Sequence, residues 1–541
     1  MGVSMTKDLL KEVRQLDEKL LDLLIKRTLL YSDYLRNKRK KNLSISVRDF
    51  EGTLWKVWNQ KTKVLGISPK TLRTLYNYYN NLCHELAEKE EEKVFKLKPF
   101  KIKPVTINLA GPFDTELTRF LIYTSTLKNF PIEIKHVVLN DSIYQLIKAL
   151  NALNASFTWD RDFLYRKHGP FLNFNKKAIF TGENELNLYL LIFAAISQAG
   201  VCKFTGDSSL KSLDLRPLFS LLPHMGARIA PLIPGSYGLP IRIESTGTIN
   251  DTLLVPEELS DSAFWALSLS TIAYNLNKIS ILAPKRDLTN PFIDRIFFIF
   301  NLLGIKYQIE HDKIIVYPEI NYHPDISHIL DPELTAYLLA IVVICGGEAI
   351  ITGTYPKDFK DGALFLKIFK NIAPNIRVEE NKITLIYKKK KLDFLSLDIE
   401  GSSKPLPLAV ALGALASKTE IKRIPVCEHD NLKYILTSLN ISYELKKDVL
   451  FLYNARKVNK KNIKVKSPSP KWSIALSLLS LMGYEIILEN PGEITKLWPT
   501  YWTYFKSIPK ISNISPTKEE KKDESNKIRR RILVSGDKKI G

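Results

Sequence analysis

A unit of one helix followed by two strands is clearest in residues 289–318. Apolar residues between 292 and 303 recur at helical spacing, and Pro291 is a residue tolerated in a first helical turn. Gly304 stands where such a helix would end. Residues 305–317 then form two apolar runs around a polar turn, which is typical of two paired strands. The segment therefore predicts helix, glycine, strand, turn and strand.

This unit recurs, and the recurrence constrains the fold more than any other feature of the chain. Further copies cover residues 142–164, 215–243, 359–387, 431–453 and, with one strand only, 472–488. A single copy cannot bury the apolar face of its helix, so the copies must pack together around shared cores. The sequence predicts a repeat architecture of mixed α/β class. The alternative is an ordinary α/β domain whose segments resemble one another by chance.

The composition sets limits on the class of protein. A chain of 541 residues predicts two to four domains, and 45% hydrophobic residues suffice for real cores. The longest apolar run, residues 334–345, is too short to span a membrane and predicts a buried helix. The cysteines Cys83, Cys202, Cys345 and Cys427 are far apart, which favours a reducing compartment, the cytoplasm, and no metal site. We expect no cofactor and no membrane contact.

The formal net charge of +22 requires an explanation. Nucleic acid, anionic small substrates or a lysine-rich proteome would each account for it. The lysines are spread along the chain, without the aromatic-plus-basic motif of a known nucleic-acid module. A basic nucleic-acid-binding protein is therefore kept only as an outside alternative.

The chain divides into four parts by pattern. Residues 5–92 predict three helices in long–short–long order, and residues 93–104 a linker of lysines and prolines. The repeat region covers residues 105–508, and the charged tail 512–541 is expected to be disordered.

The helical part contains the string LDEKLLDLLIKR at residues 16–27, which resembles the first helix of the all-helical (AroQ-type) chorismate mutases. The resemblance implies an isomerase that holds the compact conformer of chorismate and stabilises charge on its ether oxygen. It also implies a homodimer formed through this domain. The alternative is a helical dimerisation or regulatory module without catalysis.

Three positions match residues with roles in that family. By resemblance Arg27 binds a carboxylate, Lys38 reaches the ether oxygen, and Asp49 opens the second helix. Arg27 and Lys38 are eleven residues apart, about three turns, so we expect them on one helix face, lining one pocket with Asp49. The family has another arginine where this chain has Leu10, and an arginine–glutamate pair where it has Gly52 and Thr53.

The repeat region resembles 5-enolpyruvylshikimate-3-phosphate synthase, an enolpyruvyl transferase of the shikimate pathway. The strings that carry the resemblance are INLAGP (107–112), TGDSSL (205–210), DLTNPFID (287–294) and NPGEITKLWPTYW (490–502). It implies two lobes of three units each, about residues 113–322 and residues 105–112 plus 323–508, with the site between them. The chain would cross between lobes near Gly111 and within residues 318–330. The implied substrates are phosphoenolpyruvate and shikimate 3-phosphate.

Several residues match the chemistry of that family, which needs cations for phosphates and carboxylates and an acid and a base at the enol carbon. By resemblance Lys496 and Glu428 are catalytic. The expected substrate-binding positions are Thr289 and Ser262 for phosphate, Lys471 in place of an arginine, and Arg119, Lys211 and Arg216 as substitute cations.

Other positions depart from the family. A substrate lysine falls at Phe113, a substrate arginine at Leu213 and a catalytic aspartate at Leu406, and in the loop of residues 183–189 a glycine and an arginine fall at Glu185 and Tyr189. Each lost charge-assisted contact costs about 1.5–3 kcal/mol. A lost proton-transfer group costs roughly 10²–10⁴ in rate. We therefore predict little of the standard reaction. A bifunctional enzyme, a mutase with a non-catalytic partner domain, and a scaffold or regulator of the pathway remain the alternatives.

Overall fold

The computed structural model describes residues 2–40, 53–60, 68, 72–73, 75–76, 79–80, 83, 95–97, 104–284, 286, 288, 291–319, 326–453 and 462–511. The chain forms two compact units, Met1–Lys93 and Val94–Gly541. Within the described ranges, no helix has both the length and the apolar character that crossing a bilayer requires.

The first unit is helical where it is described. Helix α1 (Gly2–Lys40) is continuous over 39 residues. Residues 53–60 and the described residues between 72 and 83 are also helical. The buried side chains of Tyr31 and Cys83 pack with Tyr34 and Leu54. This packing holds the second half of α1 against the later helical residues of the same unit.

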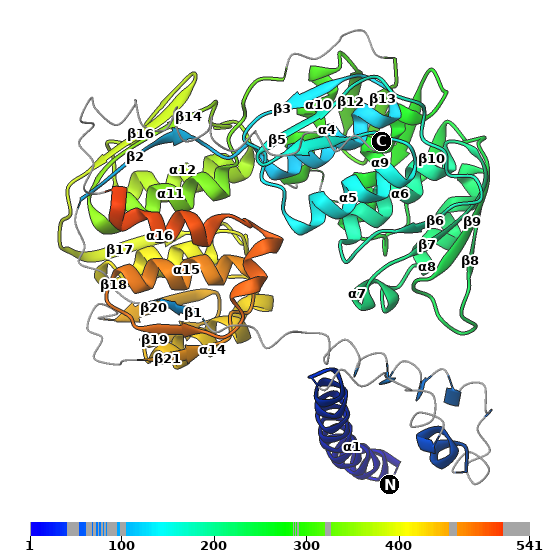
Figure 1. Ribbon diagram of the computed structural model, residues 1–541, viewed down its shortest axis with the longest axis horizontal. Helices are drawn as coiled ribbons and strands as arrows, with labels where there is room; N and C mark the ends of the chain where they lie inside the picture. Colours follow the sequence, from blue (N-terminus) through cyan, green and yellow to red (C-terminus); the bar gives the residue numbers. More distant parts are fainter. Residues whose placement is uncertain are drawn as a thin grey trace, which may run out of the picture. The chain divides into compact units, whose positions relative to one another are not determined.

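The second unit contains six sheets in two groups of three, shown in Figure 1. The first lobe has the strand orders β3-β5-β4, β6-β7-β9-β8 and β10-β11-β13-β12. Its strands are β3 (Ile132–Ile134), β4 (Thr158–Asp160), β5 (Phe163–Arg166), β6 (Ala178–Phe180), β7 (Ala199–Thr205), β8 (Ala227–Pro231), β9 (Ile241–Thr246), β10 (Thr252–Leu254), β11 (Ile279–Leu282), β12 (Lys306–Glu310) and β13 (Lys313–Tyr317).

The second lobe has the orders β15-β16-β14-β2, β17-β18-β20-β19 and β1-β22-β21. Its strands are β1 (Phe95–Leu97), β2 (Val105–Ala110), β14 (Gly347–Thr352), β15 (Arg377–Glu379), β16 (Lys382–Tyr387), β17 (Leu392–Asp398), β18 (Ala416–Lys422), β19 (Ser442–Lys446), β20 (Val449–Tyr453), β21 (Ile463–Val465) and β22 (Ile486–Leu488). Four of the six sheets share one topology, in which a parallel pair is followed by an antiparallel hairpin. The mixed α/β class expected from the repeats is confirmed.

The unit at 289–318 shows how the sequence pattern becomes structure. Helix α10 (Pro291–Leu302) is followed by Gly304, whose φ of +66° is left-handed and suits glycine. Strands β12 and β13 then pair antiparallel, with Ile309 opposite Ile314. The ring of Phe297 on the helix stacks on Tyr307 of β12 at 4.4 Å between centroids. The helix is thus fixed to its own hairpin.

Helices without a polar face lie inside the lobes. Every residue of α11 (Pro332–Cys345) is buried, as expected for the apolar run there, and the same holds for α13 (Leu406–Gly413). Both pack with α15 (Pro470–Leu481) in the second lobe, and α4 (Thr115–Leu127), α6 (Glu185–Ile196) and α9 (Asp261–Ser270) fill the first. The other helices of the unit are α5 (Asp141–Ala152), α7 (Ser208–Lys211), α8 (Arg216–Leu221), α12 (Lys360–Ile372), α14 (His429–Leu439), α16 (Tyr501–Ile511) and the short 3₁₀ helices η1 to η4.

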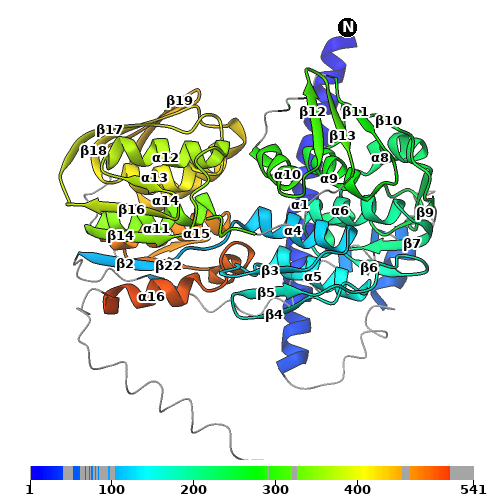
Figure 2. The same cartoon turned by 90° about the horizontal axis from the view of Figure 1, so that it is seen from above.

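The two segments that connect the lobes run side by side. Phe113 forms an antiparallel bridge with Leu330. The N–H of Asp114 donates to the Ile329 carbonyl and the N–H of Asp331 to the Pro112 carbonyl, each at 2.9 Å. Figure 2 shows α4 and α10 on the side of the first lobe that faces the second lobe. Polar residues at the starts of these helices are therefore brought to the junction.

The expected linker contributes a strand, which corrects that prediction. Residues 95–97 form β1, which pairs antiparallel with β22. Leu97 is buried in the second lobe, and the ring of Phe95 lies 4.9 Å from that of Trp502. These two apolar side chains explain why a lysine-rich stretch becomes an edge strand. The charged tail 512–541 lies outside the described residues.

Candidate active site between the lobes

A cavity of about 440 Å³ lies between the two lobes. Its lining is unusually rich in charged groups of both signs. The charged members are Glu116, Arg119, Glu183 and Arg295 from the first lobe and Asp331, Glu333, Asp361, Lys404, Lys471 and Lys496 from the second. Five basic and five acidic side chains make the lining formally neutral.

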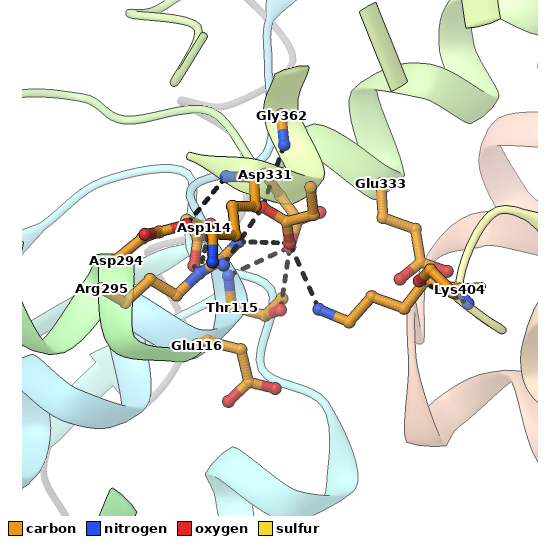
Figure 3. Close-up of polar contacts among 12 residues, drawn as sticks. Asp114, Thr115, Glu116, Asp294, Arg295, Asp331, Glu333, Gly362 and Lys404 are labelled. Atoms are coloured by element: carbon orange, nitrogen blue, oxygen red, sulfur yellow. Dashed lines mark hydrogen bonds and ion pairs between the residues drawn. The ribbon is translucent and has the colours of Figure 1, made fainter. Parts of the chain in front are cut away.

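Arg295 lies at the centre of the junction. It is the fifth residue of α10, and its Nε and Nη2 donate to both carboxylate oxygens of Asp114 at 2.7–3.1 Å. Its Nη1 and Nη2 also donate to Asp361 at 3.3 and 3.0 Å. All three residues are at least 95% buried. Because Arg295 belongs to the first lobe and Asp361 to α12 of the second, the guanidinium bridges the lobes. Figure 3 shows Arg295 beside Asp114.

Lys404 extends this buried network, with its Nζ 3.2 Å from Asp361 Oδ2. Burial opposes charge on the Arg295 guanidinium, but the carboxylates of Asp114 and Asp361 outweigh it and raise the pKa of Arg295. Burial likewise opposes the ionised form of Asp361, yet Arg295 and Lys404 lower the pKa of that carboxyl. Attraction between opposite charges therefore exceeds the cost of burial, and the network is held as ions.

Asp331 is a second buried carboxylate beside this network. Its Oδ1 accepts from the Leu334 N–H at 2.9 Å and caps α11. Its Oδ2 accepts from the N–H and hydroxyl of Thr115 at 3.1 and 2.8 Å. Burial, and then the charge of Asp114, raise the pKa of Asp331 to about 7. This carboxyl therefore titrates near neutral pH at the wall of the cavity.

The remaining basic side chains of the cavity are also paired with carboxylates. Arg119 lies 3.0 Å from Glu116 and donates to Ser142 Oγ at 2.7 Å. Lys471 lies 3.0 Å from Glu333, and Lys496 lies 3.2 Å from Glu183 and 3.4 Å from Glu493. Burial opposes charge on Lys496, but the two glutamates raise its pKa. Each of the five cations that line the cavity thus has a carboxylate partner in the chain itself.

Three of the residues expected from the sequence meet in this cavity, namely Lys496, Lys471 and Arg119. The others lie elsewhere or outside the described residues. Glu428 is not among the lining residues and accepts from Asn431 Nδ2 at 3.2 Å. Lys211 ends the short helix α7, and Arg216 is exposed and pairs with Asp214. Thr289 is not described.

Ser262 is half-buried at the start of α9 and does not line the cavity. The residue that caps α9 is Ser260, whose Oγ accepts from the Ala263 N–H at 3.3 Å and donates to Glu185 Oε1 at 2.6 Å. From the sequence alone, Ser260 and Ser262 fit the N-terminal capping position of this helix equally well. The geometry places Ser260 in the capping position and against Glu185, the first residue of α6.

The positions that depart from the family mostly supply packing. Phe113 and Leu406 are buried in the two lobes, and Leu213 packs against the first core. Tyr189 is buried, which raises its pKa to about 12. None of these four lines the cavity, so apolar packing stands where the resemblance calls for charge.

Sequence reasoning missed Arg295, Asp331 and Lys404. Asp331–Pro332 before an apolar run is a helix-start signal, and Asp331 does cap α11. Nothing local to the sequence indicates that these residues meet.

The candidate site of the helical unit centres on Arg27. Its Nη2 donates to Asn80 Oδ1 at 3.0 Å, and Nη1 lies 3.9 Å from Cys83 Sγ. The rings of Tyr31, Trp58 and Tyr79 lie within 6 Å of the guanidinium. Lys38 lies on the same helix, but its side chain and the whole of Asp49 are outside the described residues. The pocket expected from these three residues remains a prediction.

Within the described ranges, no group of three or more His, Cys, Asp or Glu side chains is arranged to hold a metal ion.

Comparison with known proteins identifies close parallels for the second unit. Residues 101–505 match the family EPSP synthase (3-phosphoshikimate 1-carboxyvinyltransferase). The 3-phosphoshikimate 1-carboxyvinyltransferase of Buchnera aphidicola subsp. Cinara cedri is 24% identical over 77% of this chain and 98% of that protein. The enzyme of the same name from Methanocaldococcus jannaschii is 22% identical over 57% of this chain and 73% of its own length.

Solved structures agree on the fold. The EPSP synthase of Acinetobacter baumannii superimposes with a TM-score of 0.64 at 15% identity, covering 77% of this chain and 98% of that one. The enolpyruvyl transferase NikO from Streptomyces tendae gives 0.60 at 13% identity with the same coverage. The two-lobed mixed α/β architecture is that of these transferases.

Proposed function

Because the chain belongs to the EPSP synthase (3-phosphoshikimate 1-carboxyvinyltransferase) family, we propose that it serves the shikimate pathway through two anion-binding sites. One lies between the lobes of the second unit and the other in the helical unit. The cytoplasm remains the location we propose for it.

The cleft between the lobes binds small anions but does not run the standard transfer of an enolpyruvyl group at a useful rate. One observation carries this proposal: all five cations of the cavity are already paired with carboxylates of the chain. Phosphoenolpyruvate and shikimate 3-phosphate together bring two phosphates and two carboxylates. A formally neutral lining cannot neutralise them without breaking buried ion pairs, which costs about 3–5 kcal/mol for each stranded partner.

Arg119 and Arg295 are 5% and 3% exposed, so the pairs that an anion can reach are those of Lys471 and Lys496, with 28% and 40% of the lysine side chains accessible. Lys496 and Glu183 are the most exposed of them, with 40% and 36% of the side chains accessible. Exposed pairs are worth only about 0–1 kcal/mol, so a ligand phosphate can compete for this lysine. The domain then acts as an anion-responsive scaffold or regulator for the helical unit.

The test is phosphate release from phosphoenolpyruvate plus shikimate 3-phosphate by the purified full-length protein. We expect no steady turnover and measurable equilibrium binding of each compound. Steady turnover that Lys496→Ala abolishes would contradict the proposal, since the substitute cations would then carry the reaction.

The helical unit is proposed to be a chorismate mutase, and Arg27 is the observation that favours it. Its guanidinium is held by Asn80 among three aromatic rings, which is a suitable setting for a carboxylate of the ligand. Chorismate loss is the assay. Arg27→Ala should lower the rate by about 10²-fold, the equivalent of about 3 kcal/mol for a charge-assisted contact.

Arg14→Ala is the matched control, because Arg14 lies on the same helix, is exposed and forms an ion pair with Glu18. It should change the rate by less than twofold. Equal effects of the two substitutions, or no chorismate loss by the wild type, would leave the non-catalytic helical module as the better interpretation.

The proposed homodimer rests on a stripe of exposed apolar side chains along α1. Residues 13, 16, 20 and 23 follow alternating steps of three and four, Leu30 lies seven residues further on, and each of the five is 50–66% exposed. The same face is covered at Tyr31, where it packs against Cys83. Covering the rest of the stripe with a second copy would remove this apolar surface from water.

Light scattering should give twice the chain mass for the wild type and the chain mass for Leu20→Lys. Val57→Lys, also at an exposed apolar residue, should leave the dimer intact.

A further inference from the structure

One ion pair of the cavity is made across the lobes by two partly exposed side chains. Glu183 follows β6 and precedes α6 in the first lobe, and Lys496 ends η4 (Pro491–Lys496) in the second. Glu183 Oε2 and Lys496 Nζ are 3.2 Å apart, and both residues line the cavity. The pair therefore closes one side of the cavity with a carboxylate from the opposite lobe.

The neighbouring residues hold this contact in place. The hydroxyl of Thr495 donates to Asp141 Oδ2 at 2.7 Å, so two consecutive residues of η4 each bind a carboxylate of the first lobe. On the other side, the Glu183 N–H donates to Gln145 Oε1 at 3.2 Å. Gly182, at φ +75°, leaves room for that amide, since a Cβ there would lie 1.9 Å from Gln145 Oε1. The backbone conformation of this loop therefore directs Glu183 toward Lys496.

Separating Glu183 from Lys496 costs less free energy than separating the buried carboxylates of the junction from Arg295. Asp114 and Asp361 are buried, so losing Arg295 would leave them charged in a dry environment. Glu183 is 36% exposed and can turn into water when another anion takes its lysine. Of the five cations, Lys496 is also the most exposed.

We propose that Glu183 is a built-in competitor that occupies the place of a ligand phosphate or carboxylate on Lys496. An anion that enters the cavity must displace Glu183 and also overcome its repulsion. The pair therefore lowers anion affinity and keeps the lobes joined while the cavity holds no ligand. This inference rests on the proposed anion-binding role of the cleft and adds how that binding is regulated.

Inorganic phosphate is the probe, and titration calorimetry on the full-length protein is the measurement. Glu183→Gln keeps the shape and removes the charge. It should bind phosphate on the order of ten times more tightly than the wild type, because both the displacement and the repulsion are lost. Adding Lys496→Ala to Glu183→Gln should remove the gain. Glu310→Gln makes the same change in net charge at an exposed glutamate paired with Lys313 and should bind within twofold of the wild type.

Each other outcome overturns the inference in a distinct way. If Glu183→Gln and the wild type bind equally, and Lys496→Ala weakens both, the cleft binds anions but Glu183 is no competitor. If neither protein binds phosphate, the anion-binding role fails and the inference with it. If Glu310→Gln gains as much as Glu183→Gln, net charge alone explains the result. Thermal unfolding of each variant checks that a lost signal does not reflect a misfolded protein.

Discussion

Replacing Arg295 by methionine is predicted to destabilise the second unit strongly. The side chain makes hydrogen bonds of 2.7–3.3 Å to Asp114 and Asp361, and all three residues are buried. Methionine fills similar space but leaves two carboxylates without this cation. Removing one partner of a buried ion pair costs about 3–5 kcal/mol. Two stranded carboxylates would suggest twice this cost. However, Lys404 still lies beside Asp361 and the Leu117 N–H still donates to Asp114, so we expect the free energy of unfolding to fall by about 4 kcal/mol in total.

The exposed pair of Arg216 and Asp214 provides a matched control. It is also a guanidinium held by both carboxylate oxygens, but 63% of the Arg216 side chain is accessible. Arg216→Met should therefore lower the free energy of unfolding far less than Arg295→Met. Both substitutions remove a guanidinium from an aspartate, and the two pairs differ in how deeply they are buried.

Urea unfolding followed by circular dichroism is the assay, with the transition of the second unit compared among the three proteins. A pH series adds a second signature. In the wild type, Arg295 and Lys404 lower the pKa of Asp361, whereas in Arg295→Met the burial of that carboxyl raises it again. The variant should thus recover part of the lost stability at pH 5, where the stranded Asp361 carboxyl can take up a proton. A cost no larger than that of Arg216→Met, or one independent of pH, would refute the reasoning.

Two further predictions concern single residues of the junction. The pKa of Asp331 is raised to about 7 in the folded protein, so between pH 4 and 7 the folded form keeps a proton that the unfolded form has released. The free energy of unfolding should therefore fall by up to about 4 kcal/mol as the pH rises from 4 to 7. In Asp331→Asn the urea midpoint should not show this part of the pH dependence. Gly362 lies in the first turn of α12, where alanine would normally stabilise a helix by about 1 kcal/mol. A Cβ there would lie 2.0 Å from the Pro356 carbonyl oxygen, so Gly362→Ala should instead lower the melting temperature, and a rise would show that the backbone yields.

Much of the fold could be predicted because it depends on neighbours along the chain. The unit at 289–318 is present as α10, Gly304, β12 and β13, since helical and strand periods and a left-handed glycine are local properties. The buried helix α11 follows in the same way from an apolar run that leaves no polar face for solvent. The linker was misjudged because Phe95 and Leu97 are surrounded by lysines in the sequence, although their strand pairs with another strand almost 400 residues later.

The site was predictable only in part. Lys496, Lys471 and Arg119 were found because their motifs carry them, and they do meet in the cavity. The carboxylates that neutralise them carry no signal of that role in the sequence. Glu183 and Glu333 look like ordinary residues of a loop and of a first helical turn.

The sequence by itself determined the repeated unit, the class of fold and the family, because periodicity and motifs are written along the chain. Only the tertiary structure decided which charges meet. Arg295 is one residue beyond a motif, yet its partners Asp114 and Asp361 are 181 and 66 positions away. The strength of such pairs depends on how far they are removed from water, and that burial exists only after two lobes from distant parts of the chain have come together.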